Sequence, residues 1–422
     1  MNIWLVSTLH LIYRTIRCLI HSLQSQLVWR LNGGRQHLHE IASDACTAAE
    51  DCQLLTILYR KKLVEGDMTS ANDFIWWHDS FVKAKEFLAP DPCWTLYTLD
   101  SEYAYFVLMP KPWPCYHARE APFVFMRQYD DAIKLARMPF KAFCRFAESS
   151  LQEPQGPVVY YSNAARSGST LLTRVMQVSE DKIASFSEPD AFTALIIFQQ
   201  RGYISEAMAI ELLKAIFKVY CKTQQSGQTY LMKVQSNGVR IVPLIKKAMP
   251  KVKHMYTYRR NTRRVVNSVE KILRGATAGD IVNFLWNIWP ELACWFVSSG
   301  AYEYEMSIRF GSKDCLDASI IVHVSSWYYY YQCRDLFDIP IIYYEDLISD
   351  KEDTLRSVFK ICELPYEKYI GEALKEFQND SQGGTALSQD NMKPVKDTPL
   401  DENRVKKIHD MCDQLGVPRI EV

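Results

Sequence analysis

From residue 158 onward, short β-forming runs alternate with stretches whose apolar residues recur at helical spacing. The predicted strands lie at 158–161, 229–234, 253–258 and 339–346. The predicted helices lie at about 169–178, 204–222, 239–249, from about 262, and up to about 361. This alternation favours an α/β layered domain with a mostly parallel sheet, in which ligands bind beyond the C-terminal ends of the strands.

The pattern before residue 156 is different. Helix formers dominate 1–90, which we interpret as a helical N-terminal region. Short aromatic runs separated by proline-rich turns predict strands between 91 and 126, and a helix is expected at 128–150. We therefore divide the chain into a helical region at 1–90, a small β and helical extension at 91–155, and the α/β domain at 156–422.

The first helix is amphipathic. One face carries Leu5, Leu9, Ile12, Ile16, Leu19, Leu23 and Leu27, and the other carries His10, Arg14, Arg17, His21 and Gln24. Arg14 and Arg17 interrupt the apolar run, so no clean membrane span is predicted. Three interpretations stay open: packing onto the rest of the protein, contact of residues 3–29 with a membrane surface, and a poor signal anchor.

Charge and cysteine content narrow the function classes. The 49 basic and 49 acidic residues balance, and no long basic block occurs, so nucleic acid is not favoured as a partner. The twelve cysteines form no C-x-x-C pair and no zinc-type spacing, and we predict no metal. Buried thiols in a reducing compartment or a few disulfides both fit, which leaves a cytoplasmic and a Golgi-membrane location open.

The run VVYYSNAARSGSTLLTRV at 158–175 predicts a strand, a loop of small residues and a helix. Backbone N–H groups in such a loop and at the helix N-terminus can hold a phosphate. Asn163 stands where a Walker loop has its first glycine, and no lysine follows Gly168. Arg166 supplies positive charge instead, Gly168 allows close approach of the backbone, and the hydroxyls come from Ser167, Ser169 and Thr170.

A second basic motif, HMYTYRRNTRRVVNSVEKIL, begins on the strand at 253–258. The strand ends at Arg259 and Arg260, and Ser268 lies eight residues after Arg260, two turns into the next helix. Strand end and helix can bring this arginine and this serine to one anion. A solvated basic helix start is the alternative.

Together the two motifs resemble the sulfotransferase family. R-S-G-S-T-L-L resembles its 5′-phosphosulfate loop, with arginine in place of lysine as in the membrane and Golgi branches. Arginine followed by serine eight residues later resembles its 3′-phosphate motif, and IIYYEDLISDKEDTLRSVFKICELP resembles its C-terminal stretch. The resemblance covers 158–365 and implies a P-loop-type three-layer fold. It also implies 3′-phosphoadenosine 5′-phosphosulfate (PAPS) as sulfuryl donor, with no metal.

The resemblance also implies catalytic roles. Lys233, 27 residues before Arg260, matches a lysine that stabilises charge on the leaving phosphate. Glu188 lies where the tyrosylprotein branch has its general base, and Asp190 is the alternative base. A solvated strand-end lysine, and a glutamate that binds backbone beside Pro189, are the structural alternatives. The loop 381–392 is expected near the 3′-phosphate, with Ser388 as a candidate contact.

We expect an enzyme that transfers a sulfuryl group to a hydroxyl or amine acceptor, such as a carbohydrate, a tyrosine or a small molecule. Two alternatives remain: a nucleotide-binding or interaction protein without turnover on the same fold, and a P-loop kinase. The absence of glycine at 163 and of lysine at 169 argues against the kinase.

Overall fold

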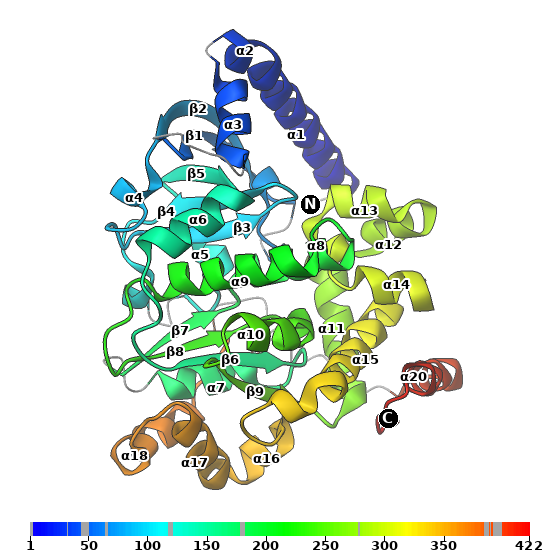
Figure 1. Cartoon of the computed structure of the whole chain (residues 1–422). Helices are drawn as coiled ribbons and strands as arrows, with labels where there is room; N and C mark the ends of the chain where they lie inside the picture. The colour runs from blue at the N-terminus through cyan, green and yellow to red at the C-terminus, as the bar shows by residue number, and fades with distance from the viewer. Residues whose placement is uncertain are drawn as a thin grey trace.

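The computed structural model of this protein describes residues 3–31, 33–43, 50–63, 66–116, 121–177, 182–276, 279–383, 388, 390 and 399–422. It contains two five-stranded sheets, the first antiparallel and the second parallel. The helix α9 (Glu206–Cys221) passes between them, as Figure 1 shows. The predicted α/β architecture with a mostly parallel sheet is confirmed for the second half of the chain.

The antiparallel sheet lies where the sequence predicted mainly helix. Its strands are β1 (Cys52–Arg60), β2 (Phe74–Val82), β3 (Trp94–Leu99), β4 (Tyr103–Leu108) and β5 (Lys134–Pro139), in the order β2-β1-β5-β4-β3. The helical prediction for 1–90 is wrong at β1 and β2. Pairing within the sheet buries the β-branched and aromatic residues of these strands, and this gain outweighs the local helix propensity. The predicted boundary at 90/91 divides this sheet, since β1 pairs with both β2 and β5.

Two further predictions in this region need correction. The run at 121–126, predicted as a strand, leads into the helix α5 (Val124–Asp131). The helix predicted at 128–150 is instead the strand β5 followed by α6 (Phe140–Ser150). Pro139 ends the strand and precedes the helix, which is consistent with its missing N–H group. The strands at 94–99 and 103–108 are confirmed.

The parallel sheet has the strand order β10-β9-β6-β8-β7. Its strands are β6 (Val158–Asn163), β7 (Ile183–Ser187), β8 (Thr229–Lys233), β9 (Lys253–Tyr258) and β10 (Ile342–Tyr343). β7 was not predicted, and β10 is shorter than predicted because α16 (Tyr344–Ser349) begins directly after it. Lys233 pairs in register with Tyr161 and Ser187, and Asn163 pairs with Thr257.

Helices cover both faces of the parallel sheet. Alternate residues of β6 point to opposite faces. Tyr160 joins a core with α9 and with α15 (Cys315–Cys333), and this core continues into the antiparallel sheet. Tyr161 joins a second core with three helices on the other face, α7 (Ser169–Met176), α17 (Lys351–Ile361) and α18 (Tyr366–Glu376). The sheet is thus buried on both faces and its C-terminal edge is left for a ligand.

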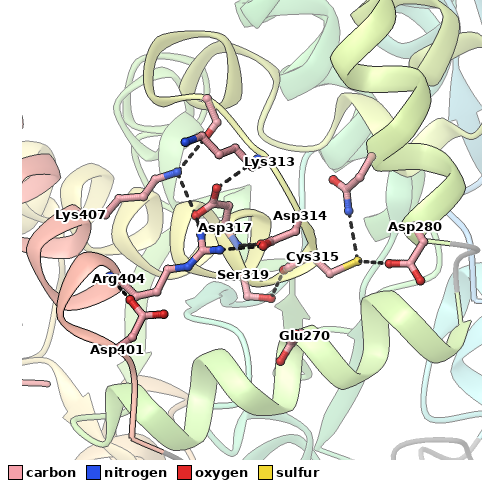
Figure 2. A network of polar contacts seen from close by, with 12 residues as sticks. Glu270, Asp280, Lys313, Asp314, Cys315, Asp317, Ser319, Asp401, Arg404 and Lys407 are labelled. Carbon is pink, nitrogen blue, oxygen red and sulfur yellow. Dashed lines mark hydrogen bonds and ion pairs between the residues drawn. The ribbon is translucent and has the colours of Figure 1, made fainter.

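The C-terminal helix α20 (Glu402–Leu415) is fixed to the start of α15 by charge. Arg404 contacts Asp317 and donates to Asp314 Oδ2 at 2.6 Å, and Lys407 lies 3.1 Å from Asp317. Figure 2 shows these two cations directed at the two carboxylates. Asp317 is almost fully buried, so its negative charge requires such partners.

The predicted N-terminal helix is present as α1 (Ile3–Leu23), and a π-helical turn and α2 (Trp29–Leu31) continue it. It packs on the protein through its polar face. Among the described residues, no helix is both long and apolar enough to cross a membrane.

Candidate functional site

The loop between β6 and α7 is a tight turn that local hydrogen bonds hold in place. Ala164 N donates to Thr257 O at 2.8 Å, and the Ser167 hydroxyl donates to Ala164 O at 2.7 Å. Arg166 and Gly168 both adopt left-handed conformations, with φ of 60° and 80°. In general, a turn with left-handed residues before a helix N-terminus can present backbone N–H groups to an anion.

Gly168 is required here for two reasons. Its φ of 80° is strained for any residue with a side chain, and a Cβ atom would lie 2.6 Å from Tyr344 Cδ2. Tyr344 therefore closes over the loop at a distance that only glycine permits. The loop, α7 and the start of α16 are consequently held together.

We expect Gly168→Ala to destabilise the protein by about 1–3 kcal/mol, because it combines backbone strain with a steric clash. Gly202→Ala is the matched control, since Gly202 has a φ of 69° but no atom within 4 Å of its added Cβ. Thermal unfolding of both variants separates the cost of backbone strain from the cost of the clash with Tyr344. Equal losses of stability would contradict the close packing of Tyr344 on Gly168.

Three arginines gather beside this loop. Burial lowers the pKa of Arg166 to about 10, and the neighbouring cations Arg259 and Arg264 lower it further in the same direction. Arg259 lies over the Tyr344 ring at 4.3 Å, with Nη1 3.5 Å from Arg166 O. A cation whose protonated form is disfavoured by other cations is stabilised by a bound anion. A phosphate or sulfate group bound here would therefore relieve the repulsion among these arginines.

A segment from the far end of the chain also contacts the loop. Gln382 accepts a hydrogen bond from Arg166 Nη1 at 2.9 Å and donates to Thr170 Oγ1 at 3.3 Å. Arg174 on α7 donates to Asp380 O at 2.7 Å. The structure thus brings residues 380–382 to the loop after β6, whereas the sequence led us to expect 381–392 near the 3′-phosphate. Ser388 is buried, and residues 384–387, 389 and 391–392 lie outside the described part of the chain.

The other loop hydroxyls make local contacts. Ser167 Oγ lies 2.9 Å from Thr257 Oγ1, and Ser169 donates to Asn163 Oδ1 at 3.2 Å. Asn163 in turn donates to Val234 O on the neighbouring strand. The residue in the position of the first Walker glycine therefore ties the loop to the end of β8.

Arg260 and Ser268 are not directed at the loop. The Arg260 guanidinium donates to both carboxylate oxygens of Asp346, at 2.6 and 3.0 Å, and lies on the Tyr343 ring at 3.7 Å. Nearly half of each charged side chain is exposed. Ser268 is buried, and its hydroxyl has no hydrogen-bond partner. Arg260 is therefore held by a carboxylate on the surface while Ser268 lies in the interior, and the common anion site expected for this pair stays a prediction.

Lys233 and Glu188 come together at the C-terminal ends of β8 and β7. Their side chains form an ion pair, and Glu188 N donates to Lys233 O at 2.6 Å. Lys233 is 1% exposed and its ammonium lies 5.2 Å from the Phe123 ring, while the Glu188 side chain is 19% exposed. Glu188 has a φ of 60°, an uncommon backbone conformation for glutamate. The ion pair thus lies at the same C-terminal edge of the sheet as the loop after β6.

Asp190, the alternative base, is tied into the structure. It is fully buried, and its two oxygens accept from Thr69 N at 2.7 Å and from Gln235 Nε2 at 2.6 Å. Burial raises its pKa to about 7, although the bond from Thr69 opposes this shift. These contacts join α8 (Asp190–Gln200) to the connection between β1 and β2, and the buried carboxylate has no exposed oxygen for an acceptor.

Sequence reasoning placed Arg259 at the end of its strand without giving it a ligand, and it did not single out Arg264 or Gln382. The doubled arginines at 259–260 and 263–264 were visible, but the motif spacing selected Arg260. Which of two adjacent arginines faces the loop depends on the twist at the end of β9, which the sequence does not reveal. Within the described residues, no group of three or more His, Cys, Asp or Glu side chains could hold a metal ion.

Comparison with known proteins gives a limited result. No family model and no curated protein matches the sequence. Among solved structures, a sulfotransferase domain from the curacin biosynthetic pathway is 13% identical with a TM-score of 0.34, covering 64% of this chain and 100% of its own. Sulfotransferase STF9 from Mycobacterium avium is 11% identical with a TM-score of 0.33, covering 67% and 83%.

A sulfotransferase from Alicyclobacillus acidocaldarius is 8% identical with a TM-score of 0.34, covering 64% of this chain and 98% of its own. TM-scores this low carry no argument about function. The functional conclusion therefore rests on the chemistry at the C-terminal edge of the parallel sheet.

Proposed function

We propose that this chain is a sulfotransferase on a P-loop-type three-layer domain. It transfers the sulfuryl group of PAPS to a hydroxyl or amine acceptor. One observation carries the proposal: the arginine-flanked loop after β6 lies at the same sheet edge as the Lys233–Glu188 pair. Phosphate-binding loops of kinases act with a metal and a lysine after the last glycine, whereas here Ser169 follows Gly168.

The residues fit the 5′-phosphosulfate end of this donor. Backbone N–H groups of 166–170 and the N-terminus of α7 would bind its oxygens, and Arg166 and Arg259 would supply positive charge. Lys233 would stabilise the charge that develops on the leaving phosphate. The hydroxyls of Ser167, Ser169 and Thr170 would also donate to the donor's oxygens, in exchange for their present local hydrogen bonds.

The reaction needs one proton acceptor. The acceptor oxygen forms a bond to sulfur while the bond between sulfur and the phosphate oxygen breaks. The products are a sulfate ester, adenosine 3′,5′-bisphosphate and one proton. Glu188 is the candidate base, because its carboxylate is partly exposed and its free oxygen can accept that proton. Carbohydrate, tyrosine and small-molecule acceptors all remain candidates.

The 3′-phosphate would bind Arg260 and Ser268. Exposed ion pairs contribute only about 0–1 kcal/mol, so Arg260 can leave Asp346 at little cost. An arginine–phosphate hydrogen bond contributes about 1.5–3 kcal/mol, which favours the exchange.

Isothermal calorimetry without magnesium tests the proposal. Adenosine 3′,5′-bisphosphate should bind at least about tenfold more tightly than 5′-AMP, because only the bisphosphate carries the group that reaches Arg260. Arg260→Ala should remove this difference, whereas Arg166→Ala should weaken both nucleotides. Asp346→Asn, which releases Arg260, should leave bisphosphate binding intact or tighten it. Equal wild-type affinity for the two nucleotides would contradict the donor assignment.

A nucleotide-binding protein without turnover is the second candidate. The closed Lys233–Glu188 ion pair favours it, since both groups satisfy each other in this structure. A screen of carbohydrate, phenol and tyrosine acceptors with radiolabelled PAPS separates the two. Sulfated product supports the enzyme, while tight bisphosphate binding without any product supports the second candidate.

A further inference from the structure

The helix α1 is packed in the reverse of the usual sense. Its polar face lies against the protein, and its apolar face is exposed to solvent. The exposed large apolar side chains of this segment are Leu5, Leu9, Leu11, Ile12, Ile16, Leu19, Leu23, Leu27 and Leu31. Most of them recur at spacings of three or four residues and form a single stripe along the segment. We call this surface the α1 stripe.

The polar face is inward because it completes an edge strand. β2 lies at the edge of the antiparallel sheet, and none of the strands that the structure describes pairs with its outer side. Arg17 donates to Phe74 O at 3.0 Å and to Ala71 O at 2.7 Å. Gln24 donates to Trp76 O at 2.7 Å and accepts from His78 N at 2.9 Å. Side chains of α1 and of the π-helical turn after it thus take the place of a sixth strand.

The N-terminal half of α1 is anchored in the same way. Tyr13 donates to Asn72 O at 2.8 Å, and Arg14 donates to Trp295 O at 2.6 Å. His10 Nε2 lies 2.9 Å from Phe296 O. Buried backbone carbonyls that lose such donors carry a substantial penalty, so these contacts fix the rotation of the helix. The outward direction of the α1 stripe is therefore set by the fold.

The surroundings of the stripe indicate what covers it. The sequence has no acidic residue before Glu40, and Arg30 and Arg35 are exposed at the C-terminal end of the segment. The other end adjoins α13 (Pro290–Phe296), where the exposed Trp295 ring lies 5.0 Å from the Arg14 guanidinium. Figure 1 shows α1 running along the outside of the molecule with α13 near its N-terminus. Tryptophan at one end, arginine at the other and alkyl groups between them suit a bilayer interface.

A second copy of the chain fits this surface less well. The segment Ile3–Leu31 is about 43 Å long at 1.5 Å per residue, so a stripe about 10 Å wide presents about 400 Å². Stable protein interfaces bury about 800 Å² per partner. A single convex helix gives about half of that area, whereas a bilayer accepts a convex cylinder along its whole length.

We propose that the α1 stripe binds the surface of a lipid bilayer, with the helix lying in the interfacial plane. Its polar side stays bound to β2, so only the outward side enters the lipid. Arg30 and Arg35 add attraction to anionic headgroups. This proposal does not depend on the sulfotransferase assignment.

Flotation of the full chain with phosphatidylcholine vesicles, with and without phosphatidylserine, tests the proposal. We expect the wild type to float with both, and more strongly with phosphatidylserine. Ile16→Gln/Leu19→Gln/Leu23→Gln should lower the partition coefficient at least about tenfold. Thr8→Gln/Thr15→Gln/Ser22→Gln, which changes exposed polar positions of the same helix, is the matched control and should float like the wild type.

The apolar-to-glutamine variant should keep its melting temperature, because the replaced side chains are exposed. Arg30→Gln/Arg35→Gln should lose only the increase due to phosphatidylserine. Failure of the wild type to float, or equal flotation of the two triple variants, would overturn the proposal. Sedimentation equilibrium tests whether the stripe binds a second copy of the chain instead. That assignment would follow if the wild type self-associates, the apolar-to-glutamine variant does not, and neither binds vesicles.

Discussion

Glu188→Gln is expected to lower sulfuryl transfer by roughly 10²–10⁴-fold, the usual loss when a general base is removed. The glutamine amide keeps the shape of the side chain and can still accept a hydrogen bond from Lys233, but it cannot take the acceptor's proton. Affinity for adenosine 3′,5′-bisphosphate should stay near the wild-type value. Steady-state transfer to an acceptor, together with calorimetry of the nucleotide, measures both effects.

Loss of the ion pair is the main complication, because Lys233 is buried. Breaking a buried pair costs at most about 3–5 kcal/mol, and less where one partner is partly exposed. Glu188→Gln/Lys233→Met removes both charges and should recover stability without recovering turnover. Recovery of turnover in this double variant would show that Glu188 only stabilises the fold.

The opposite edge of the sheet provides a matched control for Glu188. Glu363 has a φ of 56° and pairs with Lys253, the first residue of β9, at 2.7 Å. It therefore repeats the backbone conformation and the strand lysine of the Glu188 site, remote from the loop after β6. Glu363→Gln should leave turnover unchanged. Near-normal turnover in Glu188→Gln would transfer the role of base to another carboxylate and leave the donor assignment intact.

The parallel sheet was predictable because its strands are short apolar runs bounded by turns. Buried strands such as 229–233 and 253–258 leave this signal in the sequence. β7 escaped prediction because Ile183–Ser187 contains alanine and two serines, which give neither an apolar run nor a clear alternation. Its burial comes from neighbours on both faces of the sheet, which a single sequence does not show.

The N-terminal half was harder for a related reason. The segment 52–60 contains leucines and is followed by Lys61 and Lys62, and capping-type residues precede 74–82; these features favour helix locally. Pairing across the antiparallel sheet overrides that preference. The sequence showed that α1 is amphipathic. The side of the helix that faces the protein depends on the outer backbone groups of β2, which the helix binds. Those groups exist only because β2 is an edge strand.

The sequence identified the residues of the candidate site better than it predicted the directions of their side chains. The loop 166–170, Lys233 and Glu188 do meet at one sheet edge, as parallel register requires once β6, β7 and β8 are neighbours. The direction of Arg260 was not predictable, because Asp346 competes for it across the short strand β10. The spacing of a motif identifies the residues that can reach a ligand. In the absence of the ligand, the positions of these side chains depend on other partners in the fold, such as Asp346.

Lys233→Met is expected to lower sulfuryl transfer by about 10²–10³-fold, comparable to the loss of one preorganised donor at a developing anion. The buried ammonium lies at the end of β8, one strand away from the loop that would hold the phosphosulfate. Methionine fills a similar volume without charge. Binding of adenosine 3′,5′-bisphosphate should change much less than turnover, since the charge on the leaving phosphate develops mainly in the transition state.

The pH profile separates the role of Lys233 from that of Glu188. Where proton transfer limits the rate, turnover falls as pH falls because the base becomes protonated. Lys233→Met should keep this acidic limb at a lower overall rate, while Glu188→Gln should abolish it. Lys253→Met, which removes an ion-paired lysine from the start of a neighbouring strand, should keep the wild-type rate and profile. A Lys233→Met enzyme with wild-type turnover would exclude Lys233 from charge stabilisation and limit it to holding Glu188 in place.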